Sequence, residues 1–217
     1  MKMNLMQWIG ALAAALLLTG TPAWAGPAED VARMQQGWEQ IKYGTPADRQ
    51  ETEFARLLAD SEGLAARNPG NADVLIWYAI VESTYAGAKG GIGALKYVKN
   101  ARKSLEQALA INPNALAGSA YTSLGSLYYQ VPGWPIGFGD KAKAEDLLKK
   151  GLAANPDGID PNYFYGDYLY RKGEFDEAER YLRKAMQAPA RSGRKLADEG
   201  RRGEAKELLN KIAQGKK

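Results

Sequence analysis

The chain of 217 residues is long enough for one ordinary domain, carries a formal charge of +4, and contains no Cys and no His. The lack of Cys excludes disulfides, thiol catalysis and thiolate metal sites, and the lack of His removes the commonest general base and metal ligand. Carboxylate or lysine chemistry stays open, but no catalytic set is evident. We therefore expect a protein that is not an enzyme and that binds no metal or cofactor.

The first 25 residues have the pattern of a secretory signal peptide. A positive charge at Lys2 precedes an apolar run from Trp8 to Leu18, and small residues lead up to Ala25. The run is short for a membrane span. We expect cleavage after Ala25 and a periplasmic or secreted protein, with an uncleaved amino-terminal anchor as the alternative.

The mature chain, residues 26–217, begins with two expected helices. Residues 27–49 predict one helix, EDVARMQQGWEQIKY, which ends at the following GTP. Residues 53–69 read as the second helix of a degenerate first repeat unit. No later apolar run is a candidate membrane span, so no integral span is expected after signal cleavage.

Three Asn-Pro pairs recur at spacings of 44 and 43 residues, beginning at Asn68, Asn112 and Asn155. Alignment on these pairs brings apolar positions into register, among them Leu105 with Leu148. Each unit reads as two helices, the first rich in aromatic residues and the second with one apolar stripe at helical spacing. Each Asn is expected to end its helix, because proline disfavours helical geometry at the residue before it.

The next unit, residues 162–189, is the most regular. Small and large residues stand at offsets 0, 7, 9, 12, 16 and 19, at Gly166, Gly173, Phe175, Ala178, Leu182 and Ala185. This pattern resembles the tetratricopeptide repeat (TPR) family, although the closing Pro189 comes one residue early. Gly173 is expected to adopt a left-handed conformation in the turn between the two helices.

The TPR resemblance covers roughly residues 53–210. It implies an all-α fold in which helix pairs stack in a short right-handed superhelix, as a single domain over residues 26–217. It also implies a concave surface that binds a protein or peptide. Residues 195–212 then read as a terminal helix pair or a capping helix with a polar outer face.

The two middle units carry equal insertions between their helices, around AGAKGGIGALKYVKN and within YYQVPGWPIGFGD. Equivalent turns of stacked repeats share one edge, so the insertions should lie side by side as two enlarged loops. Either each loop buries its own apolar residues over a helix end, or both loops form one wall of a contact surface; the two readings can hold together. Trp134 is expected to face outward, because prolines bracket it in a turn.

The candidate partner-binding residues come from these insertions and from the aromatic helix at residues 160–170. They are Ile92, Tyr97, Tyr129, Trp134, Ile136, Phe138, Asp140, Tyr163, Tyr165 and Tyr168. Ordinary repeat packing of the tyrosines, and capping of the following helix by Asp140, are the alternatives.

The leading hypothesis is a non-catalytic periplasmic scaffold that binds a protein or peptide through its concave face and enlarged apolar loops. The alternative is a small-ligand-binding accessory subunit, because the plan is similar to the TPR-like periplasmic subunits of TRAP (tripartite ATP-independent periplasmic) transporters. Nucleic acid is not an expected partner, since basic residues are dispersed without interleaved aromatic residues. The segment 183–217 has 11 basic and four acidic side chains, which indicates a solvated last helix or contact with an anionic surface.

Overall fold

The computed structural model describes residues 26–215, and the predicted signal peptide lies outside the described residues. Within this range the chain forms nine α-helices, two short 3-10 helices and no strand. The α-helices are α1 (Pro27–Gly44), α2 (Ala47–Arg67), α3 (Ala72–Lys89), α4 (Leu95–Ile111), α5 (Ser119–Gln130), α6 (Lys141–Ala154), α7 (Ile159–Lys172), α8 (Phe175–Gln187) and α9 (Lys195–Gly215).

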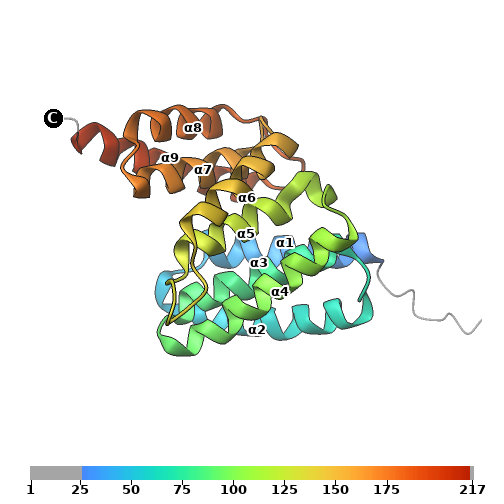
Figure 1. Ribbon diagram of the computed structural model, residues 1–217. Coiled ribbons are helices and arrows are strands. Elements are labelled where there is room, and N and C mark those ends of the chain that lie inside the picture. The colour runs from blue at the N-terminus through green and yellow to red at the C-terminus, as the bar shows by residue number, and fades with distance from the viewer. Residues whose placement is uncertain (1–25, 216–217) are drawn as a thin grey trace, which may run out of the picture.

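The helices pack as successive pairs, α1 with α2, α3 with α4, α5 with α6 and α7 with α8. Figure 1 shows these pairs stacked in chain order, from α1–α4 at one end of the molecule to α7–α9 at the other. Each pair also packs on its neighbour, so its stability depends on the interfaces on both sides. The all-α helical repeat fold predicted from the sequence is confirmed. None of the helices between residues 26 and 215 is long and apolar enough to cross a bilayer.

The repeat register is also confirmed by the core. Leu105, Leu148 and Leu182 hold equivalent places in α4, α6 and α8, and at most 1% of each residue is exposed. A Cβ atom on Gly125 would lie only 2.8 Å from Cγ of Leu148, and one on Gly166 would lie 2.8 Å from Cγ of Leu182. The two glycines therefore allow the helices of a pair to approach closely around one leucine.

The chain turns where the sequence predicts. Asn68, Asn112 and Asn155 are the residues at which α2, α4 and α6 end, and none of the three keeps helical backbone angles. Gly173 ends α7 with φ of 87° and ψ of 9°, a left-handed conformation that is costly for residues with a Cβ atom.

The two insertions are accommodated differently. In the first, α3 continues to Lys89 and α4 begins at Leu95, so much of the surplus lengthens the helices and only residues 90–94 connect them. Gly90 and Gly91 both have φ of 65°, which ends α3 at this point. In the second, residues 131–140 form an irregular loop, closed by hydrogen bonds such as Gly139 N–H to the Pro132 carbonyl at 2.9 Å.

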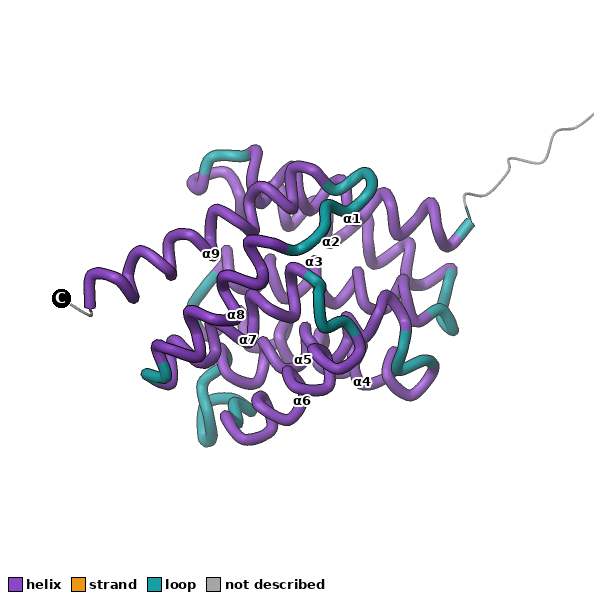
Figure 2. Tube along the Cα trace, turned by 90° about the horizontal axis from the view of Figure 1, so that it is seen from above, coloured by secondary structure: helices purple, strands orange, loops and turns teal. Residues whose placement is uncertain are grey.

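The last helix, α9, packs on α7 and α8 and also contacts α1. Nε of Arg194, just before α9, lies 3.0 Å from Oε2 of Glu39 in α1, and both side chains are nearly buried. Glu204 in α9 accepts hydrogen bonds from the Tyr43 hydroxyl at 3.3 Å and from Arg201 at 2.6 Å. In Figure 2, α9 runs along one side of the molecule to the C-terminal end of the described chain. It therefore joins the first and last helix pairs in addition to capping the stack.

We expect Glu204→Gln to lower the free energy needed to separate α9 from α1 by about 1–2 kcal/mol. The change weakens charge-assisted hydrogen bonds that are only partly exposed. Hydrogen exchange should show reduced protection in α9, with little change in α5. The matched control is Glu199→Gln, which removes an exposed carboxylate 3.8 Å from Lys195 on the same helix and should change nothing measurable. Equal protection in the two variants would show that the closure does not depend on Glu204.

Candidate functional site

A cavity of about 940 Å³ lies among helices from both ends of the chain. Its walls come mainly from α1, α3, α5 and α7, with the start of α9 and the segment 189–194 on one side. The 3-10 helix Ala115–Gly118 contributes Leu116 and Ala117. The cavity is therefore lined largely by the first helix of each pair, and α9 completes it by closing the stack on α1.

One wall is aromatic and comes from α1 and α3. The ring centres of Trp38 and Tyr43 are 5.7 Å apart, and those of Trp38 and Trp77 are 6.1 Å apart, in edge-on arrangements. The indole N–H of Trp38 donates to Oγ1 of Thr84 at 2.9 Å, which satisfies its one polar group. The guanidinium of Arg194 lies 4.8 Å from the ring centre of Trp77. These contacts hold the rings in fixed positions at the cavity surface.

A second aromatic pair comes from α7. Tyr163 and Phe164 have ring centres 5.2 Å apart, and the guanidinium of Arg201 lies 4.5 Å and 4.6 Å from them. Nε of Arg201 donates to Oδ1 of Asp160 at 2.9 Å. Cation–π contacts and an ion pair thus fix this side of the cavity before any ligand enters.

A polar stripe runs between the two aromatic walls. Ser126 donates through its hydroxyl to the carbonyl of Ser123 at 2.8 Å, one turn earlier on α5. The Ser83 and Thr84 hydroxyls likewise donate to the Ile80 carbonyl, so these oxygens are left to accept hydrogen bonds, such as those from the N–H groups of an extended backbone. The stripe consists of Ser83 and Thr84 of α3 and Ser119, Thr122, Ser123, Ser126 and Gln130 of α5.

The charges at the cavity neutralise one another. Burial alone would raise the pKa of Asp160, but the charges of Arg201 and Arg191 outweigh it and hold that pKa below its usual value. Burial would lower the pKa of Arg201, yet Asp160 and Glu204 keep it well above the ordinary range. Burial raises the pKa of Tyr163 to about 12. These groups keep the same charge across neutral pH, which suits a binding surface of constant character.

The backbone at the cavity wall includes two unusual residues. Leu116 and Ala117 have φ of 46° and 52°, in the left-handed region that residues with a Cβ atom rarely adopt. Such conformations cost energy and concentrate at ligand-contacting segments. Both residues contact the cavity, which supports its assignment as the functional surface.

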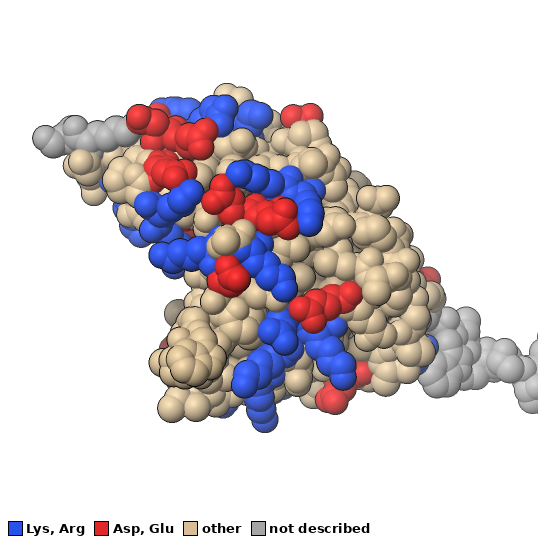
Figure 3. Space-filling view, viewed as in Figure 1, with Lys and Arg blue, Asp and Glu red and all other residues tan. Residues whose placement is uncertain are grey.

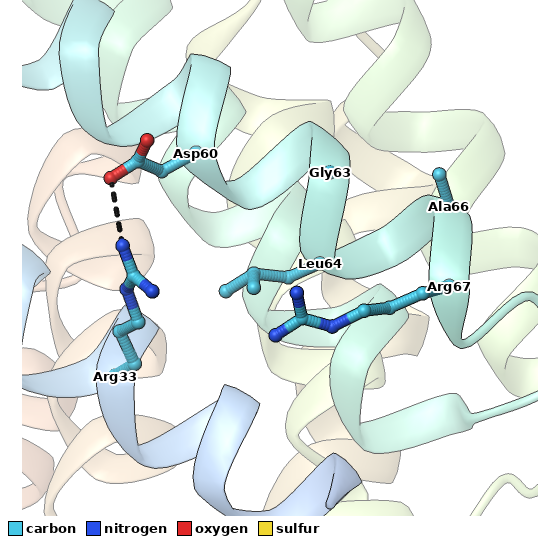
Figure 4. A pocket seen from close by; sticks show the side chains of 6 residues that line it. All are labelled: Arg33, Asp60, Gly63, Leu64, Ala66 and Arg67. Atoms are coloured by element: carbon cyan, nitrogen blue, oxygen red, sulfur yellow. Dashed lines mark hydrogen bonds and ion pairs between the residues drawn. The ribbon is translucent and has the colours of Figure 1, made fainter. Parts of the chain in front are cut away.

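A smaller hollow of about 490 Å³ lies between α1 and α2 (Figure 4). Arg33 and Asp60 face one another there with Nη2 and Oδ2 3.2 Å apart, and Arg67 lies alongside Leu64. Nε of Arg67 donates to buried Asp30 at 3.1 Å. These ion pairs join the two helices, so we assign the hollow a structural role.

The predicted loop residues lie outside the cavity. Trp134 is 90% exposed, Ile92 85% and Ile136 61%. Phe138, by contrast, is half-buried with its ring centre 5.4 Å from that of Tyr128. The loop of residues 131–140 therefore buries part of its apolar surface and exposes the rest.

Tyr97, Tyr129 and Asp140 each make a contact within the protein, although Asp140 is exposed. Tyr97 is half-buried against Tyr85, with ring centres 4.8 Å apart. Asp140 caps α6, since its Oδ1 accepts from the Lys143 N–H at 3.0 Å. The Tyr129 hydroxyl donates to Oδ2 of Asp167 at 2.7 Å.

Of the three predicted tyrosines on α7, the structure places one at the cavity. Tyr163 lines it, whereas Tyr165 and Tyr168 are 4% and 3% exposed in the core. The ring of Tyr165 lies edge-on to Tyr181 with centres 4.8 Å apart. Tyr163 therefore lies at the cavity surface, whereas Tyr165 and Tyr168 fill space between helices away from it.

The predicted site residues do not include Trp38, Trp77 or the arginines at the cavity. For the two tryptophans the sequence holds one signal, the aromatic character of the first helix in each unit. It holds none for Arg194 and Arg201, whose places depend on α9 returning to α1.

The sequence model of the tetratricopeptide repeat matches residues 159–190, which span α7 and α8. A thermophilic TPR protein of Thermus thermophilus is similar in structure, with a TM-score of 0.52 and 19% identity over 83% of this chain and 98% of that one. A crystal structure of MamA is more distant, with a TM-score of 0.44 and 21% identity over 76% of this chain and 90% of that one. No curated protein matches the sequence.

These comparisons support a TPR-type helical repeat protein with one clearly recognisable repeat at α7 and α8. Stacked helical repeats of this kind form extended concave surfaces that serve for binding. Among residues 26–215, no three acidic side chains are grouped closely enough to hold a metal ion.

Proposed function

We propose that the protein is a non-catalytic scaffold that binds an extended peptide segment of a protein partner in its concave cavity. The observation that carries the proposal is the cavity of about 940 Å³, in which two fixed aromatic walls flank a stripe of hydroxyl and amide side chains. Aromatic rings provide contact area with few rotors, and the hydroxyl groups can pair with a bound backbone.

The charge pattern favours a partner segment of low net charge. The arginines of the cavity already face carboxylates, as Arg191 and Arg201 face Asp160. A strongly charged ligand would have to compete with these ion pairs, whereas an uncharged segment would leave them intact. We expect a segment with aromatic or aliphatic side chains, bound through its backbone to the α5 stripe.

The proposed place of action is the periplasm or another exported location. The support is the signal-like pattern of residues 1–25 in the sequence. Mass measurement of protein from the native host should find a chain that begins at Gly26. A chain that retains Met1 in membrane fractions would overturn this part of the proposal.

The runner-up function is carriage of a small ligand, as in an accessory subunit of a TRAP-type transporter. One observation favours it, since the cavity volume falls within the usual range for small-molecule sites. The residues that line the cavity favour a peptide over a small ligand, because serines, glutamines and paired charges interrupt the apolar surface.

We expect Ser123→Trp to weaken peptide binding by at least about tenfold, or about 1.4 kcal/mol, because the indole would fill the cavity beside the α5 stripe. Peptides selected from a random library on residues 26–217 provide the ligands, and fluorescence anisotropy measures their affinity. The matched control, Gln107→Trp, adds the same ring on the exposed face of α4 and should bind as the unmodified protein does. Equal affinity in the two variants, or failure to select any peptide, would rule out the peptide-binding cavity.

A further inference from the structure

The three most exposed large apolar side chains of the described chain all lie in the two insertions. Ile92, Trp134 and Ile136 are 85%, 90% and 61% exposed, whereas the next, Ile111 and Phe175, are 44% exposed. Single exposed apolar residues are normal on a protein surface, but three such tips gathered in two adjacent repeats are not. None of the three lines the cavity or belongs to the buried core.

These tips stand on rigid bases. Tyr85 and Tyr97 pack edge-on below the first insertion, and Tyr128 and Phe138 do so below the second. Within the second loop, the Gly137 N–H donates to the Gly133 carbonyl at 3.1 Å. The exposed apolar side chains therefore project from loops whose bases are packed.

Basic side chains surround the same insertions. Residues 89–105 contain five basic and no acidic side chains, and residues 131–143 contain two basic and one acidic. Nζ of Lys96 lies 4.6 Å from the ring centre of Tyr97, and Nζ of Lys143 lies 4.4 Å from that of Tyr128. The guanidinium of Arg102 in α4 lies 4.7 Å from the ring centre of Phe138, which places α4 against the second loop.

The surface view agrees with this arrangement. In Figure 3, uncharged surface projects at the lower left edge, where Figure 1 places the loop before α6, and basic side chains lie beside it. Elsewhere on this face, acidic and basic side chains are interspersed. A few acidic side chains reduce the positive charge around the insertions. One is Glu51, whose Oε1 lies 3.4 Å from Nζ of Lys89.

We propose that the two insertions dock the protein on an anionic lipid bilayer. Trp134, Ile136 and Ile92 enter the boundary between head groups and acyl chains, and the surrounding lysines face the lipid phosphates. Indole rings favour the membrane interface, and basic residues near the surface are attracted to anionic lipids. Trp134 and Ile136 flank Pro135 in one loop, Ile92 stands between two glycines in the other, and all three are mostly exposed. Side chains that project in this way suit a fluid surface better than the shaped pocket of a protein partner.

This docking surface is separate from the cavity, so it neither depends on the proposed peptide binding nor excludes it. The scaffold would present its cavity close to a membrane while the membrane contact is made by the edge of α3–α6. The charge in this region makes the contact sensitive to salt.

The experiment uses residues 26–217, which lack the apolar segment of the predicted signal peptide. Co-sedimentation compares vesicles of phosphatidylcholine with vesicles that also contain phosphatidylglycerol. We expect binding to the anionic vesicles, a loss of binding at high salt, and a loss of about tenfold or more in Trp134→Ala. Lys96→Glu combined with Lys99→Glu should also abolish binding. The controls Phe175→Ala and Lys206→Glu change a partly exposed aromatic residue and an exposed lysine away from the insertions and should bind normally.

Fluorescence provides a second readout, in which a tryptophan of the unmodified protein reports its own contact with the bilayer. Trp38 and Trp77 are buried, so quenching by brominated lipid should report mainly on Trp134 and should disappear in Trp134→Ala. Failure of the unmodified protein to bind anionic vesicles would overturn the proposal. Vesicle binding by Trp134→Ala equal to that of the unmodified protein would also overturn the proposal. If Trp134→Ala then failed to bind the peptides selected on the unmodified protein, the insertions would be a protein-binding surface instead.

Discussion

Replacing Leu148 with Ala should lower the free energy of unfolding by about 2–5 kcal/mol. Leu148 is fully buried, and it fills the space that Gly125 leaves between α5 and α6. Truncation removes buried methyl groups and leaves a cavity that the two closely packed helices cannot fill without moving their backbones. Denaturant unfolding followed by circular dichroism measures the change.

The control for this prediction is Ile111→Ala at the end of α4, where the side chain is 44% exposed. It removes a similar number of methyl groups from a side chain that is already partly in solvent. We expect the free energy of unfolding to change by no more than about 0.5 kcal/mol. Because neighbouring repeats stabilise one another, Leu148→Ala should also reduce hydrogen-exchange protection in α3 and α7. A Leu148→Ala protein that unfolds at the same denaturant concentration as the Ile111→Ala protein would refute the repeat register.

The place of Leu148 follows from the sequence because a repeat relates residues at a fixed spacing. Once the Asn-Pro pairs are aligned, Leu105 and Leu148 must occupy equivalent interfaces. The helix ends follow for the same reason, since Asn-Pro and Gly173 act on the local backbone. Local and nearest-neighbour features of the fold were therefore predictable.

The cavity was less predictable, because it depends on contacts between segments far apart in the chain. Arg194 and Glu39 are 155 residues apart, and no repeat spacing relates them. The side-chain directions on α7 posed the same difficulty. Its crowded aromatic residues indicated that some would face inward and some outward, but only the position of α9 decides that Tyr163 faces the cavity.

The insertions show a further limit of sequence reasoning. Their equal length indicated two similar loops, but the first is mostly absorbed by α3 and α4 because its residues up to Lys89 and from Leu95 sustain a helix. The second contains Pro132 and Pro135, which exclude a regular helix there. Length alone could not distinguish the two outcomes, whereas the exposure of Trp134 was expected from the prolines beside it.

Replacing Glu82 with Gln should stabilise the protein by roughly 3 kcal/mol at pH 8 and change its stability little at pH 5. Glu82 in α3 stands at the position that Gly125 and Gly166 occupy in the next two units. It is 1% exposed, and its Oε2 atom has no hydrogen-bond partner. Burial raises the pKa of this carboxyl to about 7, and a hydrogen bond from Asn100 offsets that rise only in part.

The direction of the pH effect follows from proton binding. Between the unfolded pKa of about 4.5 and the folded pKa of about 7, the folded protein holds a proton that the unfolded chain has lost. Raising the pH through this range therefore favours the unfolded state, and the loss is complete once both states are ionised. Glutamine has nearly the size and polarity of the protonated acid but cannot ionise, so Glu82→Gln should lose this pH dependence.

The chain is well suited to this measurement because it has no His to titrate in the same range. The free amino terminus titrates near pH 8, but it is common to both proteins and cancels in the comparison. Denaturant unfolding at several pH values between 5 and 8 should give two curves that lie within about 1 kcal/mol of one another at the acidic end and separate steadily above it. Parallel curves across the whole range would mean that Glu82 is ionised in the folded protein at pH 5, and that water or a shift of α4 solvates it.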